Sequence, residues 1–470
     1  MLNPTRPRMD TNRKSEYTTV EEETAAHEEA VAAQLAQWEK HLPDLLKKFA
    51  RIPDPRRPGS VRHSVTVLLM YGLLLFVFHY ASRREANREM TGPTLATMLR
   101  SVFPSVDSTP HFDTVERLLR TIPVETLEEF PEDRVTNILK KHHIRAYLVD
   151  QGWVVAIDGT QKTVRNNPFA KEALRQKVSG TSDTYRYRVY VLESVLIADD
   201  GLTLPLPTEF CENIPDADPE SKQDCELKAF RRLAKRLKRW FPRRLLVLVM
   251  DGLYPNGPVI DLCRSQGWDF MIVLPAQCLP SVWEEFLALR ASDLDGTSRR
   301  EHQWGNRVQV FTWVNGIAYT YQDGQGKRHT LTVHVVQCEE TWTDPKGKRQ
   351  RRVWAWLSER PLTVDNVVAR CNRGARQRWD IESTFLVQKR HGGHYEHAFS
   401  YDWQAMNGWH HLMKLAHLLN VLTLWSDVGR ALMRRYGYDG TVKFLRQTWA
   451  NPWLNVAFLQ EWAIRMVRDG

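Results

Sequence analysis

The chain contains 470 residues, of which 42% are hydrophobic and 26% are charged, so a largely disordered protein is excluded and roughly two to four globular domains are expected. Lys and Arg outnumber Asp and Glu by 65 to 56, and the net charge of +9 favours a polyanionic partner without establishing one. Six cysteines occur without any CxxC pair, which indicates reduced thiols and a cytoplasmic protein. The polar segment 1–21 also lacks a signal-peptide pattern.

Helical patterns fill the first third of the chain. Residues 1–20 have the character of a flexible arm, and residues 21–48 are rich in Ala, Leu, Glu and Gln, which favour a helix. The Pro- and Gly-containing segment 54–59 ends that helix. Further helices are expected over about 62–90, 93–101, 111–121 and 125–148. We therefore predict an arm and a helix in residues 1–60, followed by an all-helical region in residues 61–150.

One apolar stretch invites comparison with a membrane span. Val65–Tyr80 is about 16 residues long, whereas a helix that crosses a bilayer needs about 20. We therefore predict a fully buried helix and no membrane partner, and keep a membrane-associated protein built around this stretch as the alternative.

Strand-like segments begin after residue 150. The expected elements, in chain order, are strands Trp153–Ile157, Tyr185–Ile197 and Leu202–Leu206, helix Ser221–Trp240, strand Leu245–Met250, helix Val259–Gln266 and strand Phe270–Leu274, with a turn at 199–201. Continuous apolar runs among them are typical of central strands covered on both faces. This order is that of an RNase H-like α/β fold, so we assign residues 151–280 to the first part of such a core.

A β-rich insertion is expected to interrupt this core. Residues 281–357 contain strand-like runs separated by turn signals such as Asn315-Gly316. The strands are expected at 307–313, 317–322, 329–338 and 352–357.

A long helix follows the predicted insertion. It begins near Thr363, ends at His391 before two glycines, and is expected to kink at Gly374. We assign residues 358–425 to the second part of the core, which includes this helix, and residues 426–470 to C-terminal helices.

Two of the apolar runs end in an Asp-Gly pair, at Asp158 and at Asp251. Adjacent strands of an open sheet place their end residues close together in a crevice. An unpaired Asp at the end of a buried strand is costly, and a bound cation would relieve that cost. The alternative for each pair is an ordinary turn, because Asp-Gly is a common turn dipeptide.

The late helix presents an acid between two bases. Arg378, Glu382 and Lys389 are four and then seven residues apart, which at about 100° per residue places them within roughly 40° of one another on a helix. A metal-binding acid flanked by phosphate-binding bases suits a nuclease. The alternative is a solvated face with ordinary ion pairs.

This helix resembles the signature of a transposase family. The signature Y-x2-R-x3-E-x6-K marks a group of DDE-type insertion-sequence transposases, and here it reads Ala375, Arg378, Glu382 and Lys389, so the tyrosine and its phosphate contact are missing. Further resemblance lies at Arg376, Trp379 and Ile381, at 54–57 and 62–64, and at 112–117. The resemblance covers about residues 50–425.

The resemblance implies a catalytic, metal-binding triad of Asp158, Asp251 and Glu382. These residues would hold two Mg²⁺ ions, for which Mn²⁺ could substitute. One ion would activate water or a 3′-hydroxyl as the nucleophile, and the other would stabilise the leaving oxygen.

The same resemblance implies residues that contact DNA. Arg378 and Lys389 would hold phosphates beside the scissile bond, and Arg376 is a further DNA-binding candidate. In relatives that cut through a DNA hairpin, an aromatic residue of the insertion stacks on a flipped base. Trp304 and Trp313 are the candidates here, and core packing is the alternative for each.

The function implied is cleavage at element ends and strand transfer into target DNA. A homodimer would hold two double-stranded ends, in a cytoplasmic bacterial protein that joins the nucleoid when DNA-bound. The helical region 61–150 would bind DNA, although it has no clear helix-turn-helix pattern. The alternatives are a catalytically inactive or domesticated DNA-binding relative, which the replacement at Ala375 favours, and a nuclease without strand transfer.

A separate basic run lies at Lys228–Arg244, where nine residues are Lys or Arg. It either lines a path for DNA or forms a solvated helix that covers the sheet.

Overall fold

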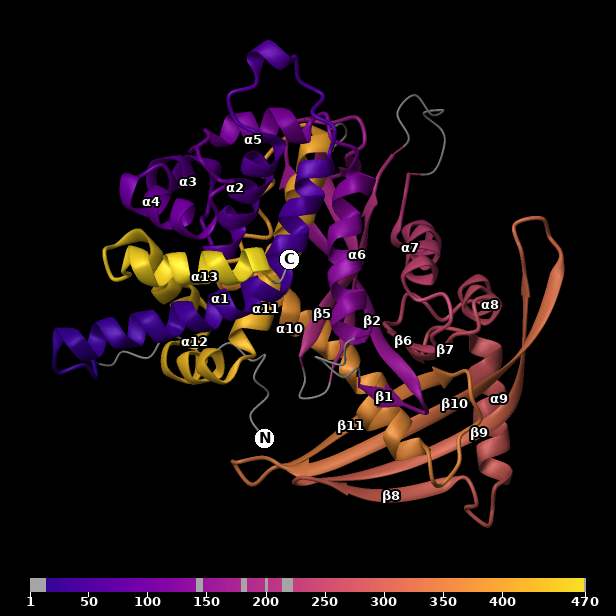
Figure 1. Cartoon of the computed structure of the whole chain (residues 1–470). Coiled ribbons are helices and arrows are strands. Elements are labelled where there is room, and N and C mark those ends of the chain that lie inside the picture. Colours follow the sequence, from indigo (N-terminus) through magenta and orange to yellow (C-terminus); the bar gives the residue numbers. More distant parts are fainter. Residues whose placement is uncertain (1–13, 141–146, 179–183, 199–201, 214–222, 469–470) are drawn as a thin grey trace.

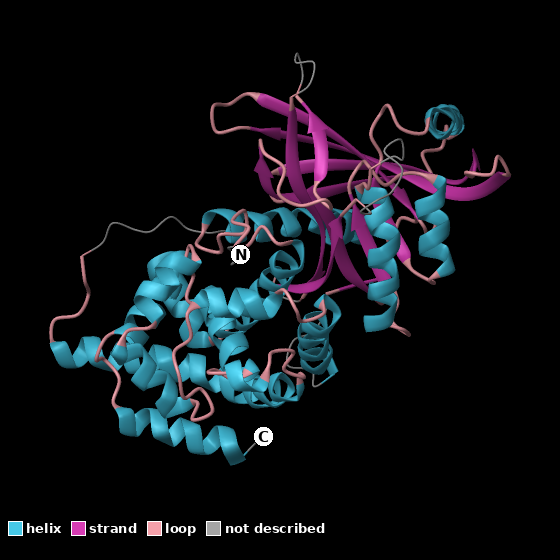
Figure 2. Cartoon of the chain, turned by 90° about the horizontal axis from the view of Figure 1, so that it is seen from above, coloured by secondary structure: helices cyan, strands magenta, loops and turns pink. Residues whose placement is uncertain are grey.

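The computed structural model describes residues 14–140, 147–178, 184–198, 202–213 and 223–468. The protein is a mixed α/β structure in which a helical N-terminal region is followed by a mixed sheet. Figure 1 shows helices from both ends of the chain gathered on one side of the molecule, and Figure 2 shows the sheet with its covering helices on the other. All six cysteines are free thiols.

The helical side combines the beginning and the end of the chain. Its helices are α1 (Val20–Arg51), α2 (Val65–Val77), α3 (Arg83–Met90), α4 (Pro93–Val102), α5 (Phe112–Leu119), α6 (Val124–Lys140), α11 (Trp403–Leu424), α12 (Asp427–Ala450) and α13 (Val456–Arg468), with a 3-10 turn, η1, at Pro58–Ser60. The side chains of Thr19, Ser64 and Ser82 each accept a backbone N–H of a first helical turn, which fixes three of these starts. Packing of α1 on α12 and of α11 on α2 joins the two ends of the chain in one core.

Helix α2 is buried along its whole length. All 13 of its residues are buried, which confirms the prediction of a buried helix. No helix in the described ranges combines the length and the apolar character that a bilayer crossing requires. The prediction of a single helix over 62–90 is wrong, because the chain turns after α2, where His79 has a φ of 55°, and α3 begins at Arg83.

One sheet of 11 strands forms the other side. Its strands are β1 (Leu148–Val149), β2 (Gly152–Arg165), β3 (Leu174–Lys177), β4 (Tyr185–Ile197), β5 (Thr203–Cys211), β6 (Leu246–Met250), β7 (Asp269–Val273), β8 (Arg299–Trp304), β9 (Arg307–Gln322), β10 (Arg328–Thr343) and β11 (Arg349–Ser358). The order across the sheet is β3-β4-β2-β6-β7-β11-β10-β9-β8, with β1 paired to β2 and β5 paired to β4. Strands β2, β6 and β7 are parallel to one another, and the other pairs are antiparallel.

Alternate residues of the central strands face two separate cores. The covering segments are α7 (Glu226–Trp240), α8 (Gly257–Ser265), α9 (Pro280–Ser292), η3 (Ala369–Gly374), η4 (Ala375–Arg378) and α10 (Trp379–Arg390). Val155 and Leu248 face the side covered by α7, α8 and α9. Val154 and Val249 face the opposite side, covered by η3, η4 and α10. A strand buried on both faces is apolar at successive positions, as predicted for the run that forms β6.

The β-rich segment extends this same sheet, because β11 pairs with β7. The predicted turn at Asn315-Gly316 is wrong. Strand β9 runs through both residues and pairs with β10 on either side of them, and the irregular register near Val333 accommodates the φ of 82° at Gly316. Helix α9 and strand β8 also lie in this segment and were not predicted.

The predicted long helix before His391 consists of three shorter segments. A π-turn, η3, passes into the 3-10 turn η4 and then into α10. The change occurs at Gly374, with φ −105° and ψ −87°, which confirms the predicted kink.

Four predicted elements reach residues outside those described: the arm 1–20 through residues 1–13, and the helix Ser221–Trp240 through residues 221–222, are two of them. The helix predicted over 125–148 corresponds to α6, which ends at Lys140; residues 141–146 lie outside the described residues, and Leu148 already belongs to β1. The turn predicted at 199–201 also lies outside them.

Candidate functional site

The parallel pair β2 and β6 brings Asp158 and Asp251 close together where β6 ends. Ala156 lies opposite Val249 in the parallel register, and each aspartate lies two residues further along its strand direction. Asp158 Oδ1 accepts the N–H of Gly159 at 2.9 Å, and Asp251 Oδ1 accepts the N–H of Leu253 at 2.8 Å. Asp251 directly follows β6, which ends at Met250, as the sequence predicts. Asp158 lies inside β2, which pairs with β4 through this residue and continues to Arg165, so the predicted end of that strand at Ile157 is wrong. The parallel register nevertheless places the two aspartates at equivalent positions of neighbouring strands.

A single guanidinium joins Asp158 to the late helix. Arg378 Nη1 lies 3.3 Å from Asp158 Oδ2, and Arg378 Nη2 lies 2.7 Å from Glu382 Oε1. Arg378 is the last residue of η4, so the first turn of α10 carries Glu382 over the edge of β2. The structure thus brings two acids separated by more than 200 residues into contact with one cation.

The charge balance around Asp158 is unfavourable for its ionised form. Burial raises the pKa of Asp158 to about 7, Arg378 opposes that rise, and the nearby carboxylates of Asp251 and Glu226 add to it. One guanidinium therefore does not offset the burial of this carboxylate beside two other acids.

Glu226 is a further acid at this edge that was not predicted. It is the first residue of α7, and its two carboxylate oxygens accept hydrogen bonds from the hydroxyls of Tyr190 at 3.1 Å and Tyr254 at 2.7 Å. Its carboxylate lies so close to Gly159 that a Cβ at that position would collide with it. Burial raises the pKa of Glu226, and Asp251 adds to the rise. The available signal was an acid five residues into the helix predicted from Ser221, which many solvated helices share.

The predicted metal ligands fit a divalent cation in chemistry but do not form a closed metal-binding group. Among the described residues, no three or more His, Cys, Asp or Glu side chains are close enough to one another to hold a metal ion. Carboxylate oxygens are nevertheless the ligands that Mg²⁺ and Mn²⁺ prefer. The buried carboxylate of Asp158 lacks sufficient positive charge beside it, and the guanidinium of Arg378 contacts two of the three predicted ligands.

A small aromatic cavity adjoins Asp251. It measures about 130 Å³ and is lined by Asp251, Gly252, Val273, Trp354, Trp356, Ala375, Arg376, Arg378 and Trp379. Ala375, which replaces the tyrosine of the signature, is buried here at 3% exposure. The smaller side chain therefore contributes to a space between two tryptophan-bearing elements, β11 and α10.

The predicted DNA contacts differ in how accessible they are. Arg376 forms an ion pair with Glu340 at 2.5 Å and stacks at 4.7 Å from the ring of Trp304, which is 40% exposed. Trp313 is buried in the core beneath η3 and η4, so of the two tryptophan candidates only Trp304 has an exposed surface.

Lys389 lies further along the same edge, on the last turn of α10. Its ammonium donates to the carbonyl of Gln161 at 3.2 Å and lies 3.2 Å from Glu396. Gln161 is three residues beyond Asp158 on β2. Lys389 therefore lies further along that strand than Arg378, away from the acids.

The comparison with known proteins concerns the helical region. Residues 46–132 match the family model described as DDE_Tnp_1-associated, a domain of DDE-type transposase families. The match runs from the end of α1 into α6, so Asp158, Asp251 and Glu382 lie outside it. No curated protein matches the chain. The chain therefore carries a domain associated with DDE-type transposases, and a transposase-related function is indicated.

Proposed function

We propose that the chain is a DDE-type DNA transposase that cleaves DNA at element ends and transfers the strand into target DNA. The catalytic core is RNase H-like, consists of residues 151–280 and 358–425, and is interrupted by residues 281–357. One observation carries the proposal: the carboxylates of Asp158 and Glu382 contact the same guanidinium, beside Asp251 at the end of the neighbouring parallel strand. The transposase-associated domain at 46–132 supports it independently.

Asp158, Asp251 and Glu382 are the proposed ligands of two Mg²⁺ ions, or of Mn²⁺ in their place, which would supply nucleophile activation and stabilisation of the leaving oxygen. The protein provides a carboxylate at Asp158 that is costly to ionise in the buried edge of the sheet, so the site favours positive charge. In the absence of DNA, Arg378 neutralises part of the negative charge of these acids. When its two acids have another cationic partner, the guanidinium becomes available to a phosphate next to the scissile bond.

The remaining predicted contacts belong to the DNA path on the α10 face. Lys389 would hold a phosphate further along β2, near Gln161, whose carbonyl its ammonium contacts. The exposed face of Trp304, supported by Arg376, offers a surface on which an unpaired base can stack. The helical region 61–150 is the proposed reader of the element ends, and a homodimer in the cytoplasm would hold two ends together.

A plasmid assay tests this function. Supercoiled DNA that carries the gene with its natural flanks is incubated with protein and Mg²⁺, and nicked, linear and joined products are separated. We expect all three products with the wild-type chain. Asp158→Asn, Asp251→Asn and Glu382→Gln should abolish cleavage but retain DNA binding, whereas Asp365→Asn, at an exposed acid, should cleave normally.

The two alternatives give different products. A catalytically inactive DNA-binding relative would bind the flanks without nicking them in any divalent metal. A nuclease without strand transfer would nick them but yield no joined product. Cleavage that persists in any of the three triad variants would refute the assignment of that residue.

A further inference from the structure

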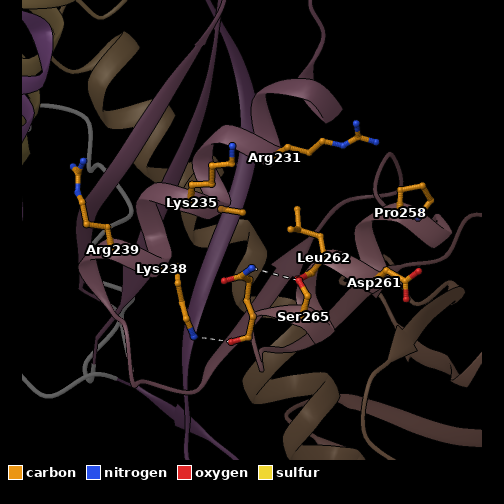
Figure 3. A pocket seen from close by; sticks show the side chains of 10 residues that line it. Arg231, Lys235, Lys238, Arg239, Pro258, Asp261, Leu262 and Ser265 are labelled. Carbon is orange, nitrogen blue, oxygen red and sulfur yellow. Dashed lines mark hydrogen bonds between the residues drawn. The ribbon is translucent and has the colours of Figure 1, made fainter. Parts of the chain in front are cut away.

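A basic groove lies between α7 and α8 on the face of the sheet opposite α10. It has a volume of about 870 Å³ and is lined by Arg231, Ala234, Lys235, Lys238, Arg239, Pro258, Asp261, Leu262, Ser265 and Gln266. Figure 3 shows the basic side chains on the α7 side and Asp261 on the α8 side. The only acid in the lining, Asp261, accepts a hydrogen bond from Tyr321. The groove therefore carries a clear excess of positive charge.

The same helix carries two arginines of a different kind. Arg232 pairs with Glu209 at 2.5 Å and Asp224 at 2.6 Å, and Arg236 pairs with Glu128 at 2.8 Å. These two side chains tie α7 to β5 and α6, as a sheet-covering helix requires. The basic run of the sequence thus serves a structural purpose on one face of α7.

On the groove face, two of the four positive charges are not neutralised. Arg231 and Lys235 are exposed, and across the described ranges neither has an acidic partner within 4.0 Å. Lys238 donates to the carbonyl of Gln266 at 2.9 Å, and Arg239 pairs with Glu132 at 3.1 Å. Like charges four residues apart repel one another on a helix, by about 0.2–0.5 kcal/mol for each pair. The chain retains this repulsion at Arg231 and Lys235, where a bound anion would remove it.

The groove begins close to the candidate site. Helix α7 starts at Glu226, and Arg231 follows five residues later, which is about 7.5 Å along the helix axis. Pro258 of α8 lies seven residues after Asp251. From this edge the groove runs back along the face opposite the one that carries Arg378 and Lys389. The two basic surfaces therefore approach the acids from opposite faces of the sheet.

The lining also indicates what kind of nucleic acid fits. It contains no aromatic side chain among its described residues, so it offers no platform on which unpaired bases stack. Flexible Lys and Arg side chains bind phosphates without reading sequence. A duplex that is bound through its backbone alone matches this chemistry, and strand transfer requires such a duplex as its target.

We propose that the α7/α8 groove binds the phosphate backbone of target DNA, with Arg231 and Lys235 as direct phosphate contacts. This inference rests on the proposed function, since it assigns one of the two DNA substrates of that reaction to a surface. Element ends are bound on the α10 face, and the target duplex reaches the acids from the α7 face.

Binding to a random-sequence duplex tests the groove without any chemistry. Fluorescence anisotropy is measured for the full chain between 50 and 200 mM salt, for wild type and for Arg231→Gln/Lys235→Gln. If two phosphate contacts are lost, the slope of log K against log[salt] becomes less negative by about two. The ratio of the affinity at 50 mM salt to that at 200 mM salt then falls about twelve-fold. Arg434→Gln/Arg465→Gln removes the same charge from exposed positions on α12 and α13 and should keep the wild-type slope.

Product analysis separates this inference from the proposed function. With pre-cleaved element ends, the groove variant should join ends to target poorly while it nicks the donor plasmid at the wild-type rate. A wild-type slope and normal joining in an active protein would overturn the groove assignment alone. A slope that changes only for element-end DNA would also overturn it. Absence of metal-dependent nicking in the wild type would instead refute the proposed function.

Discussion

Replacement of Asp158 by Asn should stabilise the protein at alkaline pH while it removes the proposed activity. The carboxylate lies within β2, largely buried beside Asp251 and Glu226, and its pKa is raised from 3.8 to about 7. Asn has almost the same shape and carries no charge, so the variant avoids the cost of ionisation in this position. A residue kept for function at the expense of stability behaves in this way.

The magnitude follows from the shift of the pKa. A rise from 3.8 to about 7, at 1.36 kcal/mol per unit, corresponds to about 4 kcal/mol. The native state binds more protons than the unfolded state between these two values, so the contribution of Asp158 to stability is present below pH 3.8 and is lost as pH rises through 7. Its side chain is 17% exposed and loses an ion pair with Arg378 on substitution, so we expect Asp158→Asn to gain about 2–4 kcal/mol at pH 8.

Urea unfolding followed by tryptophan fluorescence measures this difference. The free energies of unfolding of wild type and Asp158→Asn are compared at pH 8 and at pH 4, without divalent metal. The gain should be present at pH 8 and nearly absent at pH 4. Asp269→Asn is the matched control, because that buried aspartate of β7 is held by Arg370 at 2.7 Å, and its neutralisation should destabilise the protein at pH 8.

A contrary result would identify Asp158 as an ordinary structural ion-pair partner. If Asp158→Asn is less stable than wild type at pH 8, or if the difference does not depend on pH, the carboxylate is well compensated by Arg378. The argument that the edge of the sheet favours a cation would then fail.

Three further outcomes are expected. Arg370→Ala should lower the free energy of unfolding by about 3–5 kcal/mol in urea, because it removes the buried cation of Asp269 and leaves only the more exposed Arg360 beside that carboxylate; a loss below 1 kcal/mol would show that Arg360 or water compensates Asp269. Glu226→Gln should weaken Mn²⁺ binding in calorimetry, since its charge adds to that of the acids beside it; unaltered affinity would leave it a structural anchor of α7. Lys389→Ala should reduce the salt slope of element-end binding by about one, and a wild-type slope would mean that its contacts with Gln161 and Glu396 are purely structural.

The strand before Asp251 was predictable because its residues form an uninterrupted apolar run, whereas β2, which carries Asp158, continues eight residues beyond the predicted end at Ile157. The segment Tyr185–Ile197 was predicted with the bounds that β4 has, and the run ending at Met250 is β6. Strand β6 is fully buried and β4 is mostly buried in its second half, where local composition and tertiary packing require the same residues. The approach of Asp158 to Asp251 followed from the ends of such runs.

Other features depend on contacts that no local pattern contains. Asn315-Gly316 has the composition of a hairpin turn, but pairing with β10 continues on both sides and makes it a bulge in β9. Glu226 could not be distinguished from a solvated acid, since the hydroxyls that hold it belong to Tyr190 and Tyr254 on separate elements. Periodicity cannot reveal such long-range partners.

Anomalous diffraction from crystals soaked in Mn²⁺ at pH 8 tests the central claim most directly. We predict a Mn²⁺ peak about 2.0–2.2 Å from carboxylate oxygens of Asp158 and Asp251, with Glu382 released from Arg378. Saturating Mn²⁺ that produces no peak at this edge, with Arg378 still bound to both Asp158 and Glu382, would contradict the proposed metal-dependent reaction.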